Sequence, residues 1–253
     1  FYIFLDDNDQ ELLLKLKKNP QIQVFLKDQR LYDAWGSHLH SLGEEKKNLI
    51  AEEVMVRQEL NFYVAFYLAK EQGVDWLLHM DLDELFYPNG YNLDEYFSSL
   101  QLNNVTSVTY LNYESISTQL ESENIYLSSS YFKVNHFKNR HWFYTSAQKD
   151  FFKSNNWLKE KYFLYYQNGK SSISTYCKNI TFYDVHSIVG DGNRKMGNHN
   201  YPIILHFPCA RFSDFVKKYQ RLGSFSDDWL GLPRTGDYID PFHLHARNAF
   251  LHQ

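Results

Sequence analysis

The segment VDWLLHMDLDE, residues 74–84, contains the pattern on which the rest of the interpretation depends. Its first part, residues 74–80, is an apolar run of the length expected for a buried β-strand. The run leads directly into Asp81, Asp83 and Glu84. In open α/β sheets, ligands bind at the carboxyl ends of the strands. These acidic residues are therefore the first candidates for a functional site.

A long helix is predicted ahead of this strand, over residues 44–72. Within it, apolar side chains recur at the spacing of a buried helical face, at Leu60, Tyr63, Val64, Tyr67 and Leu68. Gly73 then supplies the residue type that most often follows the end of a helix. A helix followed by a buried strand is typical of an α/β fold.

The first residues predict a unit of the same kind. An apolar strand over residues 1–5 is followed by a leucine-rich helical pattern that ends at Asn19-Pro20, and a second strand covers residues 22–26. Farther along we expect a helix over 92–102, a strand over 105–113, a turn at 168–170, a strand over 203–205 and a helix over 211–222. The prediction is one α/β domain that covers residues 1–253.

Composition limits the classes of function. The chain has 253 residues, of which 43% are hydrophobic and 22% charged, as in a folded domain with a single large core. Aromatic residues make up 18%, and such side chains also serve as platforms for sugar rings or bases. The net charge of -4 argues against nucleic acid as a partner, so a phosphate ligand would need a local positive charge such as a divalent metal ion.

The chain offers little evidence on its location. Its longest strongly apolar stretch, residues 62–69, is too short to cross a bilayer. Because the sequence opens at Phe1 inside a predicted strand, we expect further residues upstream, and the choice between Golgi lumen and cytoplasm depends on them. Cys177 and Cys209 form one disulfide bridge or remain two buried thiols, and the sequence leaves both open.

The acidic group after the strand has the composition of a metal site. On an extended chain Asp81 and Asp83 point to the same face, so both could reach one cation. Mg²⁺ and Mn²⁺ prefer such oxygen ligands and bridge them to a diphosphate. An isolated Asp-x-Asp in a loop is most often only solvated, but acids enclosed by apolar residues are costly to bury without a positive charge among them.

The stretch RQELNFYVAFYLAKEQGVDWLLHMDLDELFYP, residues 57–88, resembles the core of GT-A glycosyltransferases close to glycosyltransferase family 92 and related family-2-like enzymes. In these enzymes an Asp-x-Asp-Glu motif ends a strand and binds a metal ion and a nucleotide-sugar. Later segments follow in the family's order, at residues 111–115, 132–133, 168–171, 185–186 and 205–207 and in a helix with Lys217 and Lys218. The resemblance extends from Phe1 to about Trp229.

This resemblance implies a GT-A fold, in which helices flank a Rossmann-like mixed sheet. It also implies transfer of a sugar from a nucleotide-sugar, in the first place a UDP-sugar, to a hydroxyl of a glycan or glycoconjugate with Mn²⁺ or Mg²⁺. Asp81 and Asp83 would take the ribose and metal roles, and His206 would complete the metal coordination. His186 is a second candidate for the place of His206.

Further residues match the donor site of this family. Asp6 and Asp7 correspond to acidic residues that meet the base or ribose, although Asp-Asp-Asn-Asp is equally typical of a solvated turn. Arg57 and Lys170 would offset the charge of the diphosphate. The family's first strand, which lines the nucleotide pocket, is not found in this chain, so base recognition is only partly carried over.

Inverting transfer requires a carboxylate that takes the proton of the acceptor hydroxyl. Glu114 is the leading candidate because it follows a strand expected beside the acidic one, whereas Asp150, Asp227 and Asp228 have less ordered surroundings. Two other classes of protein compete with this interpretation. One is a metal-dependent phosphodiester or sugar-phosphate hydrolase, and the other is a carbohydrate-binding protein without catalysis.

Overall fold

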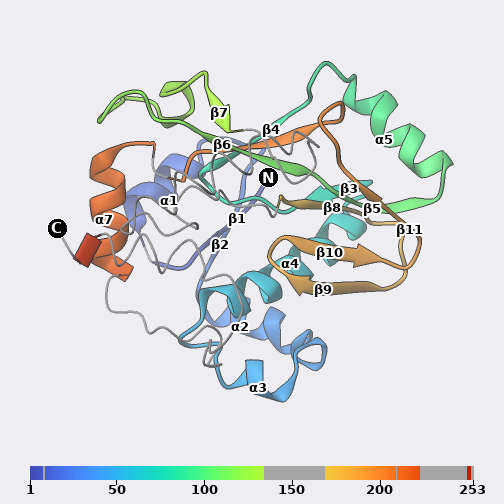
Figure 1. Cartoon of the computed structure of the whole chain (residues 1–253). Helices are drawn as coiled ribbons and strands as arrows, with labels where there is room; N and C mark the ends of the chain where they lie inside the picture. The colour runs from blue at the N-terminus through green and yellow to red at the C-terminus, as the bar shows by residue number, and fades with distance from the viewer. Residues whose placement is uncertain (8, 134–168, 209, 223–249, 252–253) are drawn as a thin grey trace, which may run out of the picture.

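The computed structural model describes residues 1–7, 9–133, 169–208, 210–222 and 250–251 (Figure 1). In these residues the chain has the predicted α/β composition, with two-stranded and four-stranded sheets flanked by helices. Helix α5 (Leu93–Leu102) lies at one end of the view in Figure 1 and α7 (Phe212–Leu222) at the other. None of the described helices is long and apolar enough to cross a membrane.

The first unit is the predicted strand, helix and strand. It consists of β1 (Tyr2–Leu5), α1 (Gln10–Leu16) and β2 (Gln23–Leu26), and the two strands pair in parallel. Asp9 is the N-cap of α1, and its side chain accepts a hydrogen bond from the backbone N–H of Leu12, at 3.0 Å. Parallel pairing brings the carboxyl ends of β1 and β2 to one edge.

The prediction of one helix over residues 44–72 is wrong in its first part. After α2 (Gln29–Gly36) and a short 3₁₀ turn η1 (Leu39–Ser41), the structure has a one-turn helix α3 (Glu44–Lys47) and then α4 (Val54–Glu71). Between them the chain leaves the helical path, and the Arg57 side chain stabilises the break. Its Nη1 donates to the carbonyls of Ile50 and Ala51, at 2.9 and 3.1 Å. Gly73 ends α4 as predicted, with a φ of 70°.

Helix α4 is enclosed on more than one side. Leu60 and Val64 belong to a cluster with Trp35 on the side of β1 and β2, whereas Phe62 and Phe66 belong to a second cluster that contains strand residues from the middle of the chain. Tyr67, which the periodicity assigned to the buried face, is 43% exposed. Enclosure by two layers explains why a single apolar stripe described this helix incompletely.

One four-stranded sheet has the order β11-β5-β8-β3. Its strands are β3 (Trp76–Leu78), β5 (Val105–Thr109), β8 (Ser171–Ser174) and β11 (Asn193–Met196). The predicted strand over residues 74–80 is therefore present but shorter. Helix α5 contacts this sheet through Tyr96 and Leu100, which cluster with Val108.

A second four-stranded sheet has the order β4-β12-β6-β7. Its strands are β4 (Glu84–Tyr87), β6 (Leu111–Ser115), β7 (Phe132–Lys133) and β12 (Ile203–His206). The predicted strand over residues 105–113 is wrong as one element, because the chain changes sheets at Tyr110. The backbone N–H of Tyr110 donates there to the carbonyl of Lys170, at 2.8 Å. Strand β4 was not predicted.

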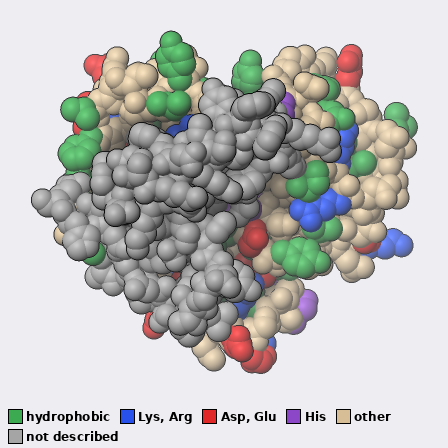
Figure 2. Space-filling view, viewed as in Figure 1, with side chains coloured by type: hydrophobic (Ala, Val, Ile, Leu, Met, Phe, Trp, Pro, Cys, Tyr) green, Lys and Arg blue, Asp and Glu red, His purple; other side chains and the backbone are tan. Residues whose placement is uncertain are grey.

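The remaining elements border these sheets. Strands β9 (Ile180–Asp184) and β10 (Ser187–Gly190) form a hairpin, and η2 (Ile125–Leu127) is one 3₁₀ turn. Cys177 is a buried free thiol, and Cys209 lies outside the described residues. On the face shown in Figure 2, the coloured surface carries side chains of both charges interspersed with apolar ones.

Candidate functional site

The acidic motif forms a turn between β3 and β4. The backbone N–H of Glu84 donates to the carbonyl of Asp81, at 3.1 Å, and the backbone N–H of Asp81 donates to Glu84 Oε2, at 2.8 Å. The prediction that Asp81 and Asp83 point the same way from an extended chain is therefore wrong. The turn sends the two carboxylates to different partners.

Asp81 is held by an internal cation. Lys170 is 0% exposed, and its Nζ lies 2.7 Å from Asp81 Oδ2 and 3.8 Å from Glu84 Oε2. Gln58 Nε2 donates to the other oxygen of Asp81, at 3.2 Å. Burial alone would raise the pKa of Asp81, but the Lys170 ammonium outweighs it and lowers the pKa to about 2. Asp81 is thus an ionised carboxylate with both oxygens engaged.

Close packing of Gly169 against the backbone of Tyr110 brings Lys170 next to the acidic turn. At Gly169, a Cβ atom would lie 1.6 Å from the carbonyl oxygen of Tyr110, so only glycine fits this approach. His186 Nδ1 contacts the carbonyl of Gly169, at 3.0 Å. A buried lysine is tolerated only when it is paired, and the carboxylates of Asp81 and Glu84 supply that pairing.

Other titratable groups around Lys170 respond to burial. Burial raises the pKa of Glu84 to about 7. The positive charge of Lys170 lowers this pKa, and the negative charge of Asp81 raises it, but burial has the largest effect. Burial, followed by the Lys170 charge, lowers the pKa of His79 and of His186 to about 4. Both histidines are therefore neutral at pH 7, and Lys170 is the cation of this cluster.

Asp83 has longer contacts than Asp81. Its Oδ2 lies 3.7 Å from His206 Nε2 and 3.8 Å from Lys218 Nζ on α7, while its backbone carbonyl accepts from Phe207, at 2.8 Å. Burial would raise the pKa of Asp83, but His206 lowers it. Burial would lower the pKa of His206, but Asp83 and Glu114 raise it to about 9, so the imidazole is protonated at pH 7. Binding of a metal ion to this imidazole would release the proton.

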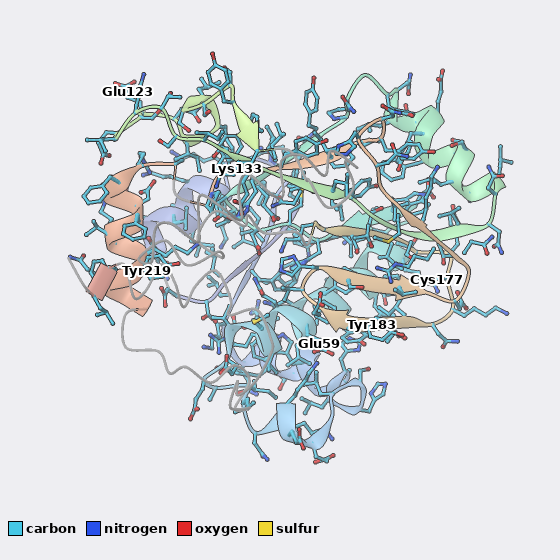
Figure 3. All side chains as sticks on the ribbon, in the orientation of Figure 1. Glu59, Glu123, Lys133, Cys177, Tyr183 and Tyr219 are labelled. Atoms are coloured by element: carbon cyan, nitrogen blue, oxygen red, sulfur yellow. The ribbon has the colours of Figure 1, made fainter. Side chains whose placement is uncertain are left out.

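A row of charged side chains crosses the second sheet. His206 on β12 is the register partner of Glu84 on β4 and of Glu114 on β6, and Glu114 is the partner of Lys133 on β7. Directly opposed residues project to the same face of a sheet. Figure 3 labels Lys133, at the edge of this row.

The donor set of Asp83 and His206 fits a divalent cation in part. Two ligands at about 2.0–2.3 Å from one ion lie about 3–4 Å apart, and the oxygen of Asp83 and the nitrogen of His206 are 3.7 Å apart. Among the residues that the structure describes, no group of three or more His, Cys, Asp and Glu is arranged to hold a metal ion. The pair could supply two ligands, and the remaining positions would need the substrate or water.

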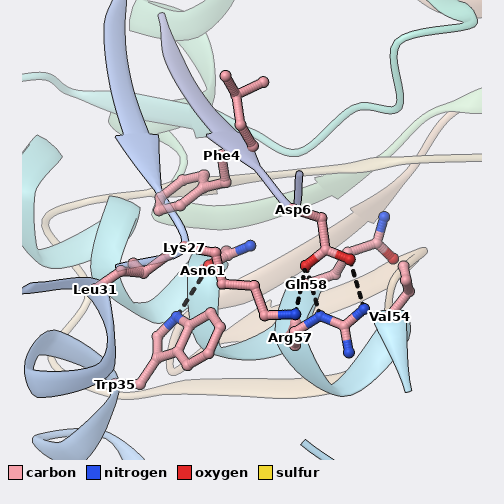
Figure 4. A pocket seen from close by; sticks show the side chains of 10 residues that line it. Phe4, Asp6, Lys27, Leu31, Trp35, Val54, Arg57, Gln58 and Asn61 are labelled. Carbon is pink, nitrogen blue, oxygen red and sulfur yellow. Dashed lines mark hydrogen bonds and ion pairs between the residues drawn. The ribbon is translucent and has the colours of Figure 1, made fainter. Parts of the chain in front are cut away.

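A pocket opens at the carboxyl ends of β1 and β2 (Figure 4). Asp6, which follows β1, forms a bidentate pair with Arg57, with Nε–Oδ1 at 2.8 Å and Nη2–Oδ2 at 2.6 Å. Arg57 is 6% exposed and its Nη1 donates to backbone carbonyls, so this guanidinium is already engaged in the pocket wall. Trp35 and Phe4 add aromatic surface.

The wall of the pocket and the acidic turn share one side chain. Gln58 lines the pocket, and the same side chain donates to Asp81. Burial would raise the pKa of Asp6, but Arg57 lowers it. Lys27, after β2, contacts Asp6 at 3.4 Å, and Asp7 lies exposed beside it. Gln58 thus links the wall of the pocket to the acidic turn by a hydrogen bond.

The structure brings together most of the residues that the sequence singled out. Asp81 lies with Lys170, and Asp83 lies with His206 and Glu114. The two sets meet at Glu84, which lies 3.8 Å from Lys170 and is the strand partner of His206. The two alternatives weighed for the base beyond residue 222, Asp227 and Asp228, lie outside the described residues, and so does Asp150.

Sequence reasoning missed three residues of this group. They are Gln58, Lys133 and Lys218. Lys133 and Lys218 lie in segments that follow the family's order, and this order could have indicated that they belong to the site. For Gln58 no pattern existed, because its contact with Asp81 joins a helix to a turn 23 positions away.

Comparison with known proteins gives two relatives. One protein of Arabidopsis thaliana named glycosyltransferase-like is 30% identical over 188 residues, which cover 68% of this chain and 38% of the relative. A second glycosyltransferase-like protein of the same plant is 29% identical over 189 residues, which cover 68% of this chain and 33% of the relative. The chain thus spans about a third of the length of these relatives. No family model matches the chain, and no solved structure matches it.

Proposed function

We propose that this chain is the catalytic part of a glycosyltransferase. It transfers a sugar from a nucleotide-sugar, in the first place a UDP-sugar, to a hydroxyl of a glycan or glycoconjugate, and it uses Mn²⁺ or Mg²⁺. Two relatives named glycosyltransferase-like support the class. The GT-A resemblance of residues 57–88 supports the donor and the metal.

The observation that carries the proposal is that one side chain, Gln58, contacts both the pocket and the acidic turn. One extended ligand could therefore occupy the two places. A nucleoside would lie against Phe4 and Trp35, with its diphosphate toward Asp83. The location at the carboxyl ends of β1 and β2 is the one at which α/β sheets bind nucleotides.

In this proposal the two aspartates of the motif have different roles. Asp83 and His206 would hold the metal ion, which neutralises the leaving diphosphate. Asp81 already binds Lys170 and Gln58, so it would orient the ribose and add charge to the metal site without large movement. Lys218, whose side chain is 31% exposed beside Asp83, would approach the diphosphate.

The roles of Arg57 and Lys170 also follow from their contacts. Both were expected to offset the charge of the diphosphate, yet each is buried and bonded to a carboxylate of the protein. We propose that they fix Asp6 and Asp81, respectively, and act on the donor through these residues. The positive charge near the diphosphate would then come from the metal ion and Lys218.

We propose that the transfer inverts the configuration of the anomeric carbon. It requires a base that reaches the acceptor hydroxyl to within about 2.6–3.2 Å in the reacting complex. Glu114, the candidate from the sequence, is 1% exposed. We therefore assign it another role below, and the acceptor base is left among carboxylates that include Asp150, Asp227 and Asp228.

Release of UDP from a panel of UDP-sugars tests the function. With Mn²⁺ and an acceptor mixture of oligosaccharides, the wild-type protein should release UDP, and chelation of the metal should stop the release. Release at the same rate without acceptor would instead indicate the hydrolase, and binding of sugars without release would indicate the carbohydrate-binding protein. Asp83→Asn is the variant expected to lose the activity, and Glu123→Gln, at an exposed position, is its control.

A further inference from the structure

Glu114 is a buried carboxylate between two cations of the row. Its side chain is 1% exposed, its Oε1 lies 3.6 Å from His206 Nδ1, and its Oε2 lies 3.6 Å from Lys133 Nζ. The contact with His206 follows from strand register, because the two residues are direct partners on β6 and β12. Two strands therefore fix this geometry.

The two nitrogens of the His206 ring face different carboxylates. Nδ1 faces Glu114, and Nε2 faces Asp83 at 3.7 Å. A carboxylate on one nitrogen holds the proton there and leaves the lone pair of the other nitrogen for a ligand. Glu114 thus selects Nε2 as the atom that His206 presents to the side of Asp83.

Burial argues against a direct part for Glu114 in proton transfer from the acceptor. An acceptor arrives from solvent, and the carboxylate has almost no accessible surface to meet it. Lys133, with 33% of its side chain exposed, lies next to Glu114 on the edge strand β7 and holds its second oxygen. Both oxygens of Glu114 are consequently directed at groups of the protein.

We propose that Glu114 is a positioning residue that orients His206 for metal binding, with Lys133 holding Glu114 in place. This assignment rests on the proposed function, because His206 is a metal ligand only in that account. Carboxylates that accept from the second nitrogen of a metal-bound histidine fix the orientation and tautomer of the ring. Their removal typically lowers metal affinity about 10- to 100-fold.

The test is Mn²⁺ binding to Glu114→Gln in the presence of UDP, followed by the electron paramagnetic resonance of free Mn²⁺. The amide keeps the shape of the side chain and removes its charge. We expect the dissociation constant for Mn²⁺ to rise about 10- to 100-fold. Transferase turnover should fall at low Mn²⁺ and return close to the wild-type value at saturating Mn²⁺.

A base would give the opposite result. If Glu114 took the proton from the acceptor, Glu114→Gln would keep its Mn²⁺ affinity and lose about 10²- to 10⁴-fold in turnover at saturating Mn²⁺. That outcome would overturn the proposal. Glu123→Gln changes an exposed carboxylate outside the row and should alter neither quantity.

Lys133→Met keeps the test decisive if Glu114→Gln does not fold, as judged by thermal unfolding. Lys133 is partly exposed, so its replacement should be tolerated, and Mn²⁺ affinity should fall in the same direction as in Glu114→Gln but by less. Unchanged affinity in the folded Lys133→Met would contradict the proposal. Absence of Mn²⁺ binding in the wild-type protein with UDP would instead refute the proposed function itself.

Discussion

Two regions of the molecule pair carboxylates with basic side chains, but at different distances between the oxygen and nitrogen atoms. At the pocket, Arg57 and Asp6 form a bidentate pair with contacts of 2.8 and 2.6 Å, and the guanidinium is almost completely buried. Around His206 on the second sheet, the contacts with Asp83 and with Glu114 are longer, at 3.7 and 3.6 Å. The pocket pair is closed, at hydrogen-bond distance, whereas the contacts of Asp83 are open.

This difference in distance distinguishes pairs that only hold the structure together from contacts that can also bind a ligand. A pair at hydrogen-bond distance has no room for a third group, whereas two ligating atoms about 3–4 Å apart can share one ion. The same contrast occurs within one motif. Asp81 contacts Lys170 at 2.7 Å, but Asp83 contacts Lys218 at 3.8 Å. The closed pairs hold the site in shape, and the open contacts are where we place the metal and the diphosphate.

The largest effect is expected from breaking a closed pair at Lys170. Lys170→Met removes the buried partner of Asp81 and Glu84 and leaves their charges close together. Loss of one partner of a buried pair costs about 3–5 kcal/mol, and the 35% exposure of the Asp81 side chain places the loss near the lower limit. Chemical denaturation measures this change.

Lys218→Met is the matched control on the open side. The ammonium of Lys218 is partly exposed and lies beside the second aspartate of the same motif. Its removal should change the free energy of unfolding by less than about 1 kcal/mol. Equal losses for the two variants would contradict the distinction between closed and open contacts.

The closed pair of Lys170 and Asp81 can also be disturbed by a change that shifts the backbone next to Lys170. Gly169→Ala would place a methyl group 1.6 Å from the carbonyl of Tyr110, so the segment that delivers Lys170 must shift. Overpacking of this kind costs about 1–3 kcal/mol, sometimes more. Gly43→Ala, where nothing lies within 4 Å of the added Cβ, should be nearly neutral. Thermal unfolding of the two variants measures both effects.

The smallest predicted effect concerns the acid stability of the pocket pair. Arg57 lowers the pKa of Asp6 below its ordinary value of 3.8, despite burial. The ion pair therefore contributes stability that is fully present above pH 3.8 and is lost as the pH falls through the lowered pKa. Asp6→Asn should show a shallower loss of stability between about pH 5 and pH 2 than the wild type. Parallel curves for the two proteins would show that the pair does not form.

The sequence predicted those parts of the fold that depend on local patterns. The unit β1-α1-β2, the end of α4 at Gly73 and helix α7 follow from apolar spacing and capping residues. It did not predict the break before α4. The hydrogen bonds of Arg57 to the carbonyls of Ile50 and Ala51 depend on the conformation of a long side chain, which apolar spacing does not indicate. The change of sheets at Tyr110 depends likewise on a distant segment, at Gly169 and Lys170.

The site shows the same limit. The sequence selected Asp83 and His206 as partners, and the structure places them 3.7 Å apart. It paired Asp81 with Asp83, however, whereas the turn directs Asp81 to Lys170. Glu114 was expected on a strand beside the acidic one, but β12 lies between β6 and β4. This strand order and the burial of Glu114 are encoded by no local pattern.

The central claim is that Asp83 and His206 on the open side join a metal ion to the nucleotide. Calorimetric titration of UDP into the protein, with and without Mn²⁺, tests it most directly. We predict that Mn²⁺ tightens UDP binding to the wild type at least about tenfold, or about 1.4 kcal/mol. Asp83→Asn should lose this gain while its metal-free affinity for UDP is unchanged. An undiminished Mn²⁺ effect in folded Asp83→Asn would contradict the account.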